Sequence, residues 1–119
     1  MSTQSFRDLL VWQKSKVLTV EIYRNFRGLR DFGFRDQIER ASVSVMNNIA
    51  EGYGRRSDKS FRQFLLIAKG SAAEVESMLI LAKELEYIDN EAQTELLDLV
   101  NETGKMLSSF AAKLSAKDY

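Results

Sequence analysis

Two pairs of polar residues near the middle of the chain have the types and spacing that could support chemistry. Asn48 precedes Glu51 in the segment NNIAEG, and Ser71 precedes Glu74 in the segment KGSAAE. Residues three apart are neighbours on a helix surface, so each pair can present its polar groups together. If the two carboxylates also meet, they could act as a paired acid and base or collect a magnesium ion.

The composition argues against both activities. The 119 residues include no cysteine and no histidine, which excludes thiolate nucleophiles and removes the commonest general base and zinc ligand. A di-iron bundle would need Glu-x-x-His motifs, and Ser71 has no base to activate it. The Walker phosphate loop is absent, as is a cluster of the E-x-x-E and E-x-x-D signatures of nucleotide pyrophosphohydrolases. We therefore predict that the protein is not an enzyme and has no catalytic residue, metal site, cofactor or small-molecule substrate.

A structural role accounts for the same polar residues. A glycine inside a helix costs about 1 kcal/mol relative to alanine, and close approach of a second helix can offset that cost. A buried amide or carboxylate also needs partners, because leaving it unpaired costs several kcal/mol. We therefore predict a polar seam that fixes the pairing of two helices. The seam would consist of Asn48, Glu51, Gly52, Gly70, Ser71 and Glu74.

Hydrophobic periodicity predicts four helices, at roughly residues 8–27, 34–54, 59–87 and 91–115. In each segment apolar residues recur at three- and four-residue steps, which marks one buried face. The chain has no proline, and no segment alternates with a two-residue period, so we predict no strand. Short connections make successive helices antiparallel. The fold class we predict is all-α, an antiparallel up-down-up-down four-helix bundle forming one domain over residues 1–119.

The composition also bears on where the protein acts. With 45% hydrophobic and 29% charged residues, the chain is typical of a globular protein. No stretch approaches the ~20 apolar residues of a membrane span, and the N-terminus has no apolar run that resembles a signal sequence. We expect a cytoplasmic protein with no membrane partner.

Some apolar residues lie away from the predicted core faces, in rows at helical spacing. One interpretation is a wide core face. The other is an interface between copies of the chain, because contiguous apolar patches usually mark interaction surfaces. The two rows comprise Leu10, Val17 and Val20 in the first helix and Leu66, Ala73 and Ile80 in the third.

Charge is divided unevenly along a chain whose net charge is zero. Residues 1–70 carry 13 Lys and Arg against 7 Asp and Glu, which gives +6, and residues 71–119 carry 4 against 10, which gives −6. The basic half could meet nucleic acid, or it could meet the acidic half of another copy. A heterologous contact of the second kind closes a ring when it repeats around an axis.

Basic residues gather at the second turn and the start of the third helix, at Arg55, Arg56, Lys59 and Arg62, with Lys69 further along. Tyr53 and Phe61 lie among them, and interleaved aromatic and basic groups suit a single-stranded nucleic acid. The alternative interpretation is a solvated basic loop whose arginines pair with nearby acids.

Three segments carry a family resemblance: FRDLLVWQKS, DQIERASVSVMNNIAEG and FRQFLLIAKGSAAEVES. With them the chain resembles the bacterial four-helix-bundle family encoded in intervening sequences of 23S ribosomal RNA genes. That resemblance implies a four-helix bundle, assembly as a homopentamer and no established biochemical activity. A related branch, the accessory proteins of diversity-generating retroelements, is pentameric, strongly basic and binds nucleic acid and a reverse transcriptase. This chain departs from that branch in its neutral charge, and it has Glu39 where many relatives carry a second arginine before Arg40.

Two functional hypotheses follow. The first is a self-assembling scaffold, a homopentamer whose partner is itself. The alternative is an RNA- or DNA-binding accessory protein that uses a basic rim around Arg55, Arg56, Lys59 and Arg62.

Overall fold

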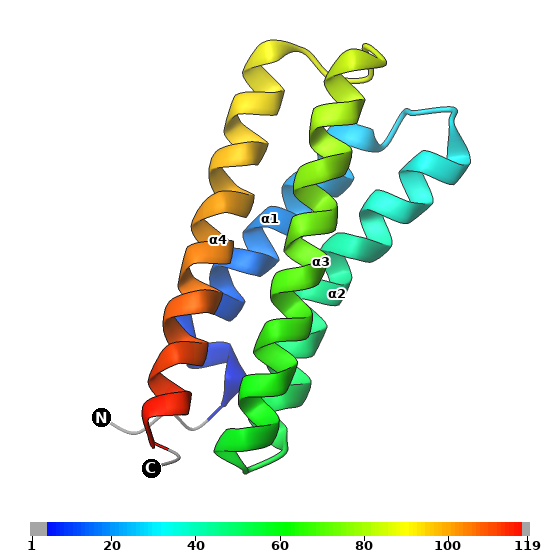
Figure 1. Cartoon of the computed structure of the whole chain (residues 1–119). Helices are drawn as coiled ribbons and strands as arrows, with labels where there is room; N and C mark the ends of the chain where they lie inside the picture. The colour runs from blue at the N-terminus through cyan, green and yellow to red at the C-terminus, as the bar shows by residue number, and fades with distance from the viewer. Residues whose placement is uncertain (1–4, 118–119) are drawn as a thin grey trace.

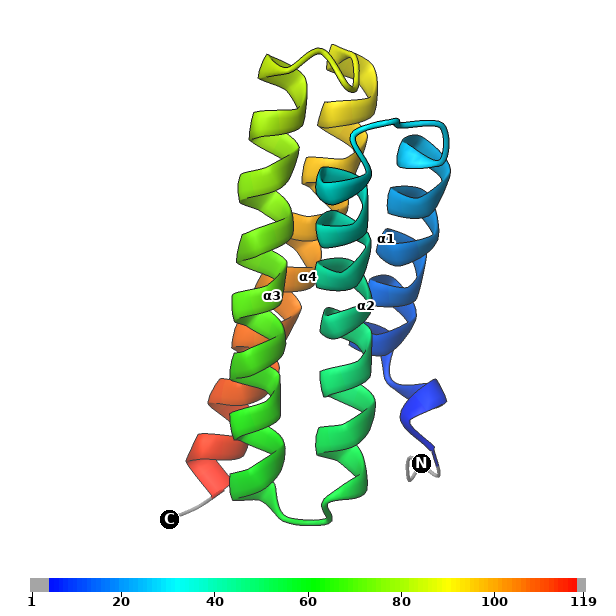
Figure 2. The ribbon, with the colours of Figure 1, turned by 90° about the vertical axis from the view of Figure 1, so that its right-hand side faces the viewer.

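Four antiparallel helices form the predicted bundle. The computed structural model describes residues 5–117 of the chain. Its elements are a short 3-10 turn η1 (Phe6–Asp8) and the helices α1 (Leu10–Phe26), α2 (Phe32–Gly54), α3 (Asp58–Glu84) and α4 (Asn90–Lys117). The helices run alternately along a rod of 48 × 24 × 20 Å, each beside the next, and α4 returns to pack on α1 (Figures 1 and 2). The all-α, up-down-up-down prediction is confirmed.

Side-chain capping groups mark the starts of α2, α3 and α4. Asp31 Oδ1 accepts a hydrogen bond from the Phe34 amide at the start of α2, Ser57 Oγ accepts from the Ser60 amide at the start of α3, and Asp89 Oδ1 accepts from the Ala92 amide in the first turn of α4. Each bond satisfies an amide that has no partner within its own helix.

All four helices differ by one to three residues from their predicted spans, and two of the differences have a local cause. The first begins at Leu10 and not at residue 8, because the preceding residues form η1, where Ser5 Oγ accepts a hydrogen bond from the Arg7 amide. The third ends at Glu84 and not at residue 87, because Glu86 takes a left-handed φ of 63°. Leu85 therefore lies outside the helix and is exposed, although the apolar pattern had placed it on the core face.

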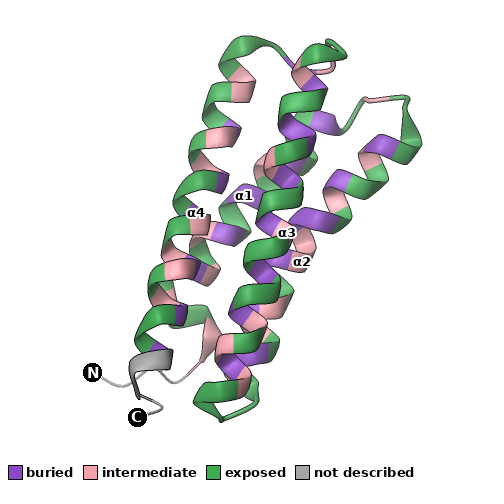
Figure 3. Cartoon of the chain, in the orientation of Figure 1, coloured by how far each residue is buried: buried purple, intermediate pink, exposed green. Residues whose placement is uncertain are grey.

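The core follows the predicted stripes along the inner face of every helix (Figure 3). Tyr23 is an exception, since it is 42% exposed although its spacing had put it on the stripe of the first helix. The largest fully buried apolar side chains come from all four helices: Leu18, Ile22, Phe26, Ile38, Val45, Ile49, Leu65, Val75, Leu79, Leu96 and Leu107.

Buried hydroxyl groups are satisfied mainly within their own helices. Thr19 Oγ1 lies 2.9 Å from the Ser15 carbonyl oxygen and 3.1 Å from that of Ser42, so its single proton is shared between α1 and α2. Ser42 Oγ donates to the Glu39 carbonyl, and Thr103 Oγ1 donates to the Leu99 carbonyl. Because these donors have partners, the core carries little penalty for its polar atoms.

A tyrosine–aspartate contact joins the two loops at one end of the rod. Tyr87 Oη donates to Asp31 Oδ2 at 2.7 Å, and this bond is the main reason that the pKa of Asp31 lies below its usual value and that the pKa of Tyr87 lies above its own. The contact therefore stabilises the fold at pH values between the lowered pKa of Asp31 and the raised pKa of Tyr87. Its effect is lost as pH falls through the lowered carboxyl pKa or rises through the raised phenol pKa.

Candidate functional site

The polar residues expected to form the seam meet partly at the interface between α2 and α3. Ser71 Oγ lies 2.9 Å from Ser44 Oγ on α2, and Asn48 Nδ2 donates to the Ser44 carbonyl at 2.8 Å and to Ser44 Oγ at 3.0 Å. All three side chains are half-buried. Asn48 and Ser71 therefore belong to one cross-helix cluster, with Ser44 as the residue that joins them.

Glu74 also reaches across to α2, through a partner that the sequence did not indicate. Gln37 Nε2 donates to Glu74 Oε2 at 3.3 Å, about two helical turns from Ser44. Both residues are exposed, so the bond competes with water and contributes little to stability.

Glu51 does not join this cluster, and its predicted place in the seam is wrong. Three residues rotate a helix by about 60° short of a full turn, which carries Glu51 from the α3 flank towards solvent. There it is exposed and pairs with Arg55 of its own helix, with Oε1 and an Arg55 guanidinium nitrogen 3.0 Å apart. An exposed i,i+4 ion pair adds only a few tenths of a kcal/mol.

The two glycines predicted to permit close packing behave differently. A Cβ atom at Gly52 would lie 2.6 Å from Phe64 Cβ and 3.0 Å from Phe61 Cδ1, so only glycine fits against α3 at this point. A Cβ atom at Gly70 would meet nothing within 4 Å, and the residue is exposed. The prediction that Gly70 permits a close helix approach within the bundle is therefore wrong.

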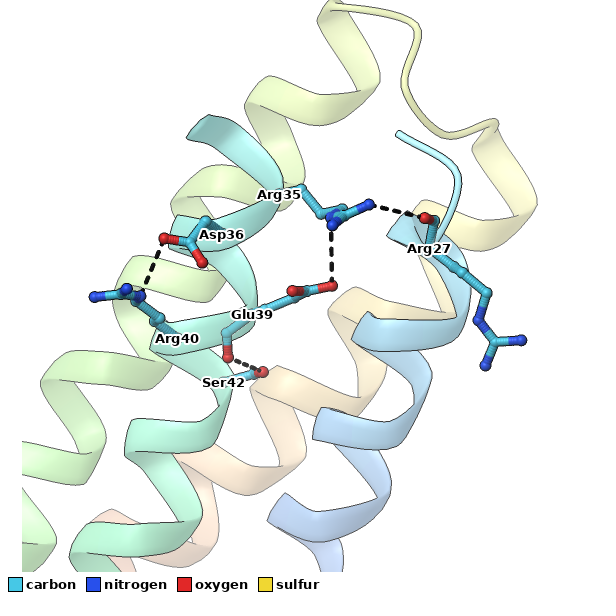
Figure 4. Close-up of polar contacts among 6 residues, drawn as sticks. All are labelled: Arg27, Arg35, Asp36, Glu39, Arg40 and Ser42. Carbon is cyan, nitrogen blue, oxygen red and sulfur yellow. Dashed lines mark hydrogen bonds and ion pairs between the residues drawn. The ribbon is translucent and has the colours of Figure 1, made fainter. Parts of the chain in front are cut away.

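The serine contact forms the floor of an open cleft of about 490 Å³ between α2 and α3. Its charged groups are already partnered. Arg40 Nε lies 3.1 Å from Asp36 Oδ2, and Glu74 accepts from Gln37 (Figure 4 shows the Asp36–Arg40 pair). Within the described residues no group of three or more His, Cys, Asp and Glu side chains could hold a metal ion. The cleft therefore offers hydrogen-bonding groups and charges that are paired with one another.

A second set of contacts links the start of α2 to Arg27, the residue that follows α1. Arg35 donates from a terminal guanidinium nitrogen to the Arg27 carbonyl oxygen at 3.1 Å, and its Nε lies 4.0 Å from Glu39 Oε2 (Figure 4). The side chain of Glu39 is only 16% exposed. Glu39 thus faces the preceding turn of its own helix, where its negative charge partly offsets the positive charge of Arg35.

The predicted basic rim lies at the α2–α3 turn, but its four members are not equivalent. Arg55, Arg56 and Lys59 are exposed, and Arg55 also stacks 5.1 Å from the centroid of the Phe64 ring. Arg56 takes a left-handed φ of 61°, a conformation that favours glycine. Arg62 is half-buried, and its Nε is buried with no hydrogen-bond partner among the described residues.

The two apolar rows are on the outside of the bundle. Leu10, Val17 and Val20 are 71%, 46% and 42% exposed, and in α3 Leu66 and Ile80 are 42% and 52% exposed. Ala73, between them, is exposed as well. The interpretation in which these residues widen the core is therefore wrong. The other interpretation, an interface between copies of the chain, agrees with their exposure.

Comparison with known proteins identifies the family of this chain. The family model described as 23S rRNA-intervening sequence protein matches residues 7–109, which is most of the chain. The chain belongs to this family. The comparison with curated proteins found no match.

A solved structure supports the assignment of this 23S rRNA-intervening sequence protein. It is the 1.70 Å crystal structure of a protein of unknown function from the S23 ribosomal protein family of Bacteroides thetaiotaomicron VPI-5482. The two chains are 30% identical, with a TM-score of 0.81 over 86% of this chain and 98% of the other. Neither comparison indicates an enzymatic activity. Among the described residues, moreover, no helix is both long and apolar enough to cross a bilayer.

Proposed function

We propose that this 23S rRNA-intervening sequence protein is a self-assembling scaffold, a homopentamer that performs no catalysis of its own. The observation that carries the proposal is the pair of exposed apolar rows on α1 and α3. Single exposed apolar residues are normal on a protein surface, whereas rows that follow one helix face usually mark an interface. The count of five comes from the family resemblance.

The energetics favour association over a monomer with this surface. Covering a half-exposed Leu, Ile or Val side chain gains about 1 kcal/mol, so the members of the two rows together supply a useful part of a subunit contact. The zero net charge leaves no overall repulsion between copies. The +6 and −6 halves of the chain also attract one another between subunits.

Sedimentation equilibrium of the full chain at micromolar concentration tests this proposal. We expect one dominant species with five times the 13.6 kDa subunit mass. A stable assembly of a different size would correct the count and leave the scaffold function in place. A chain that remains monomeric at all concentrations tested would reject the proposal.

Arg56 supports a second candidate function, binding of single-stranded nucleic acid at the α2–α3 turn. A non-glycine residue in the left-handed region costs about 1 kcal/mol, and strain of this kind is often retained where a side chain has a task. In an assembly with cyclic symmetry the exposed Arg55, Arg56 and Lys59 of every copy would gather on one rim. Repetition would then turn a weak patch into a binding surface.

Charge-reversal variants distinguish a protein that binds nucleic acid from a scaffold that does not. We expect the native protein to bind a single-stranded RNA at low salt, with affinity that falls steeply as salt rises. The triple variant Arg55→Glu, Arg56→Glu, Lys59→Glu should abolish that binding. Three reversals elsewhere on the surface, Arg27→Glu, Arg30→Glu and Arg40→Glu, form the matched control and should retain most of it. No binding by the native protein in 50 mM salt would dismiss the candidate.

A further inference from the structure

A shallow groove runs between α3 and α4 on the outer surface of the bundle. Its volume is about 660 Å³, and small residues form much of its wall. Leu66 and Ile80 continue the apolar surface of α3 along the same flank, because both share the helix face of Ala73. The groove is lined in part by Lys69, Ala72, Ala73, Glu76, Gly104 and Ser108.

The outward face of α1 carries exposed apolar side chains. Leu10, Val17 and Val20 follow one face of the helix at intervals of seven and three residues, and they project as a ridge. We call these three residues the α1 ridge. Small side chains in a groove let the ridge of another helix approach closely, which is the usual basis of helix packing. The α1 ridge cannot fill the groove of its own chain, because among the described residues no Cα atom of α1 lies within 8 Å of a Cα atom of α3.

At the level of the N-terminal half of α4, the charges beside the two surfaces are opposite in sign. In α4 the exposed Glu91, Glu95 and Asp98 form no ion pair within the described residues. The Lys14–Glu102 ion pair of 3.0 Å shows that the C-terminal half of α1 is level with the N-terminal half of α4. Arg24, in that half of α1, is exposed and paired only to the neighbouring Glu21. In a second copy at the same height, Arg24 would approach the unpaired acids of α4.

We propose that the α1 ridge of one copy occupies the α3–α4 groove of a second copy, with α1 parallel to the α3 that it contacts. This inference rests on the proposed scaffold function and names the surfaces that would perform it. The α1 ridge and the α3–α4 groove are different surfaces of one chain, so the contact is heterologous. Each copy carries one ridge and one groove. Repetition about an axis parallel to the rods closes a ring.

Cysteine cross-linking tests the contact directly, because the native chain contains no cysteine. Chains carrying Val17→Cys and chains carrying Ala73→Cys are expressed together, and the purified assembly is treated with a mild oxidant or a short bismaleimide. Both positions are exposed, so neither substitution disturbs the core. We expect a covalent dimer that contains one chain of each kind, identified by mass spectrometry. Co-expression of Val17→Cys with Asn47→Cys, on the exposed face of α2, should give at most a tenth of that yield.

The outcomes distinguish the interface from the function. An assembly of native size that gives no Val17–Ala73 product, or that gives mainly a Val17–Val17 product, overturns the heterologous contact and leaves the scaffold in place. A native chain that sediments as a monomer overturns the scaffold and this inference together.

Discussion

Replacing Gly52 with valine lowers the free energy of unfolding of this bundle by about 3 kcal/mol. The added Cβ would lie 2.6 Å from Phe64 Cβ, and that atom is fixed to the backbone of α3, so it cannot swing aside as the end of a long side chain could. The Phe61 ring closes the other side at 3.0 Å. The two helices must therefore separate locally, which loosens the packing of Phe61 against Tyr53 and Phe110.

The matched control for this variant is Gly70→Val. Gly70 also lies within a helix, but a Cβ there meets nothing within 4 Å. The same substitution should leave the free energy of unfolding unchanged to about 0.5 kcal/mol, because valine has a modestly better helix propensity than glycine. Urea denaturation followed by circular dichroism measures both values. Equal destabilisation at the two sites would show that Gly52 is not a point of close helix contact.

Introducing a charge in the α1 ridge separates the proposed assembly into single subunits. In Val17→Glu a carboxylate is placed where the proposed contact would exclude water. The groove contains Lys69 and Lys105, but removing a carboxylate from water costs several kcal/mol, and attraction to a lysine offsets that cost only when the geometry is good. A loss of 3 kcal/mol in each contact corresponds to a dissociation constant roughly 100-fold weaker. At micromolar concentration we therefore expect sedimentation to show mainly monomer.

Two comparisons make the Val17→Glu result specific. The substituted side chain is exposed in the single chain, so far-ultraviolet circular dichroism should remain that of the native helices. Asn47→Glu adds the same charge to the exposed face of α2, outside the ridge and the groove, and should leave the assembly intact. If Val17→Glu assembles as the native chain does, then α1 does not contribute to the contact between copies.

Much of this fold could be predicted because its helices are long and amphipathic. A three- or four-residue rhythm sustained over 17 to 28 residues identifies both the helix and its buried face. The helix ends were predicted less well where they depended on a single backbone angle. Glu86, for example, stops α3 with a left-handed φ that its residue type does not suggest.

The polar site was predicted only in part, for a reason that concerns helix rotation. The sequence identified Asn48 and Ser71 as unusual on core-facing stripes, and both meet across α2 and α3. It could not separate Gly52 from Gly70, because both glycines weaken a helix equally and only the orientation of the neighbour distinguishes them. Ser44 was missed because a serine on the flank of a stripe looks like an ordinary surface residue until its partner is known.

The rod shape of the subunit has a consequence for any closed arrangement of copies. If the rods lie side by side around a central axis, the 48 Å length of one bundle sets the height of the resulting barrel. That height does not depend on the number of subunits. Each subunit then contributes its α2–α3 turn, with Arg56, to one opening of the barrel. It contributes the loops joined by the Tyr87–Asp31 hydrogen bond to the other opening. The two ends of such a barrel are not equivalent. A molecule that approached one opening would therefore meet a chemically different surface from a molecule that approached the other.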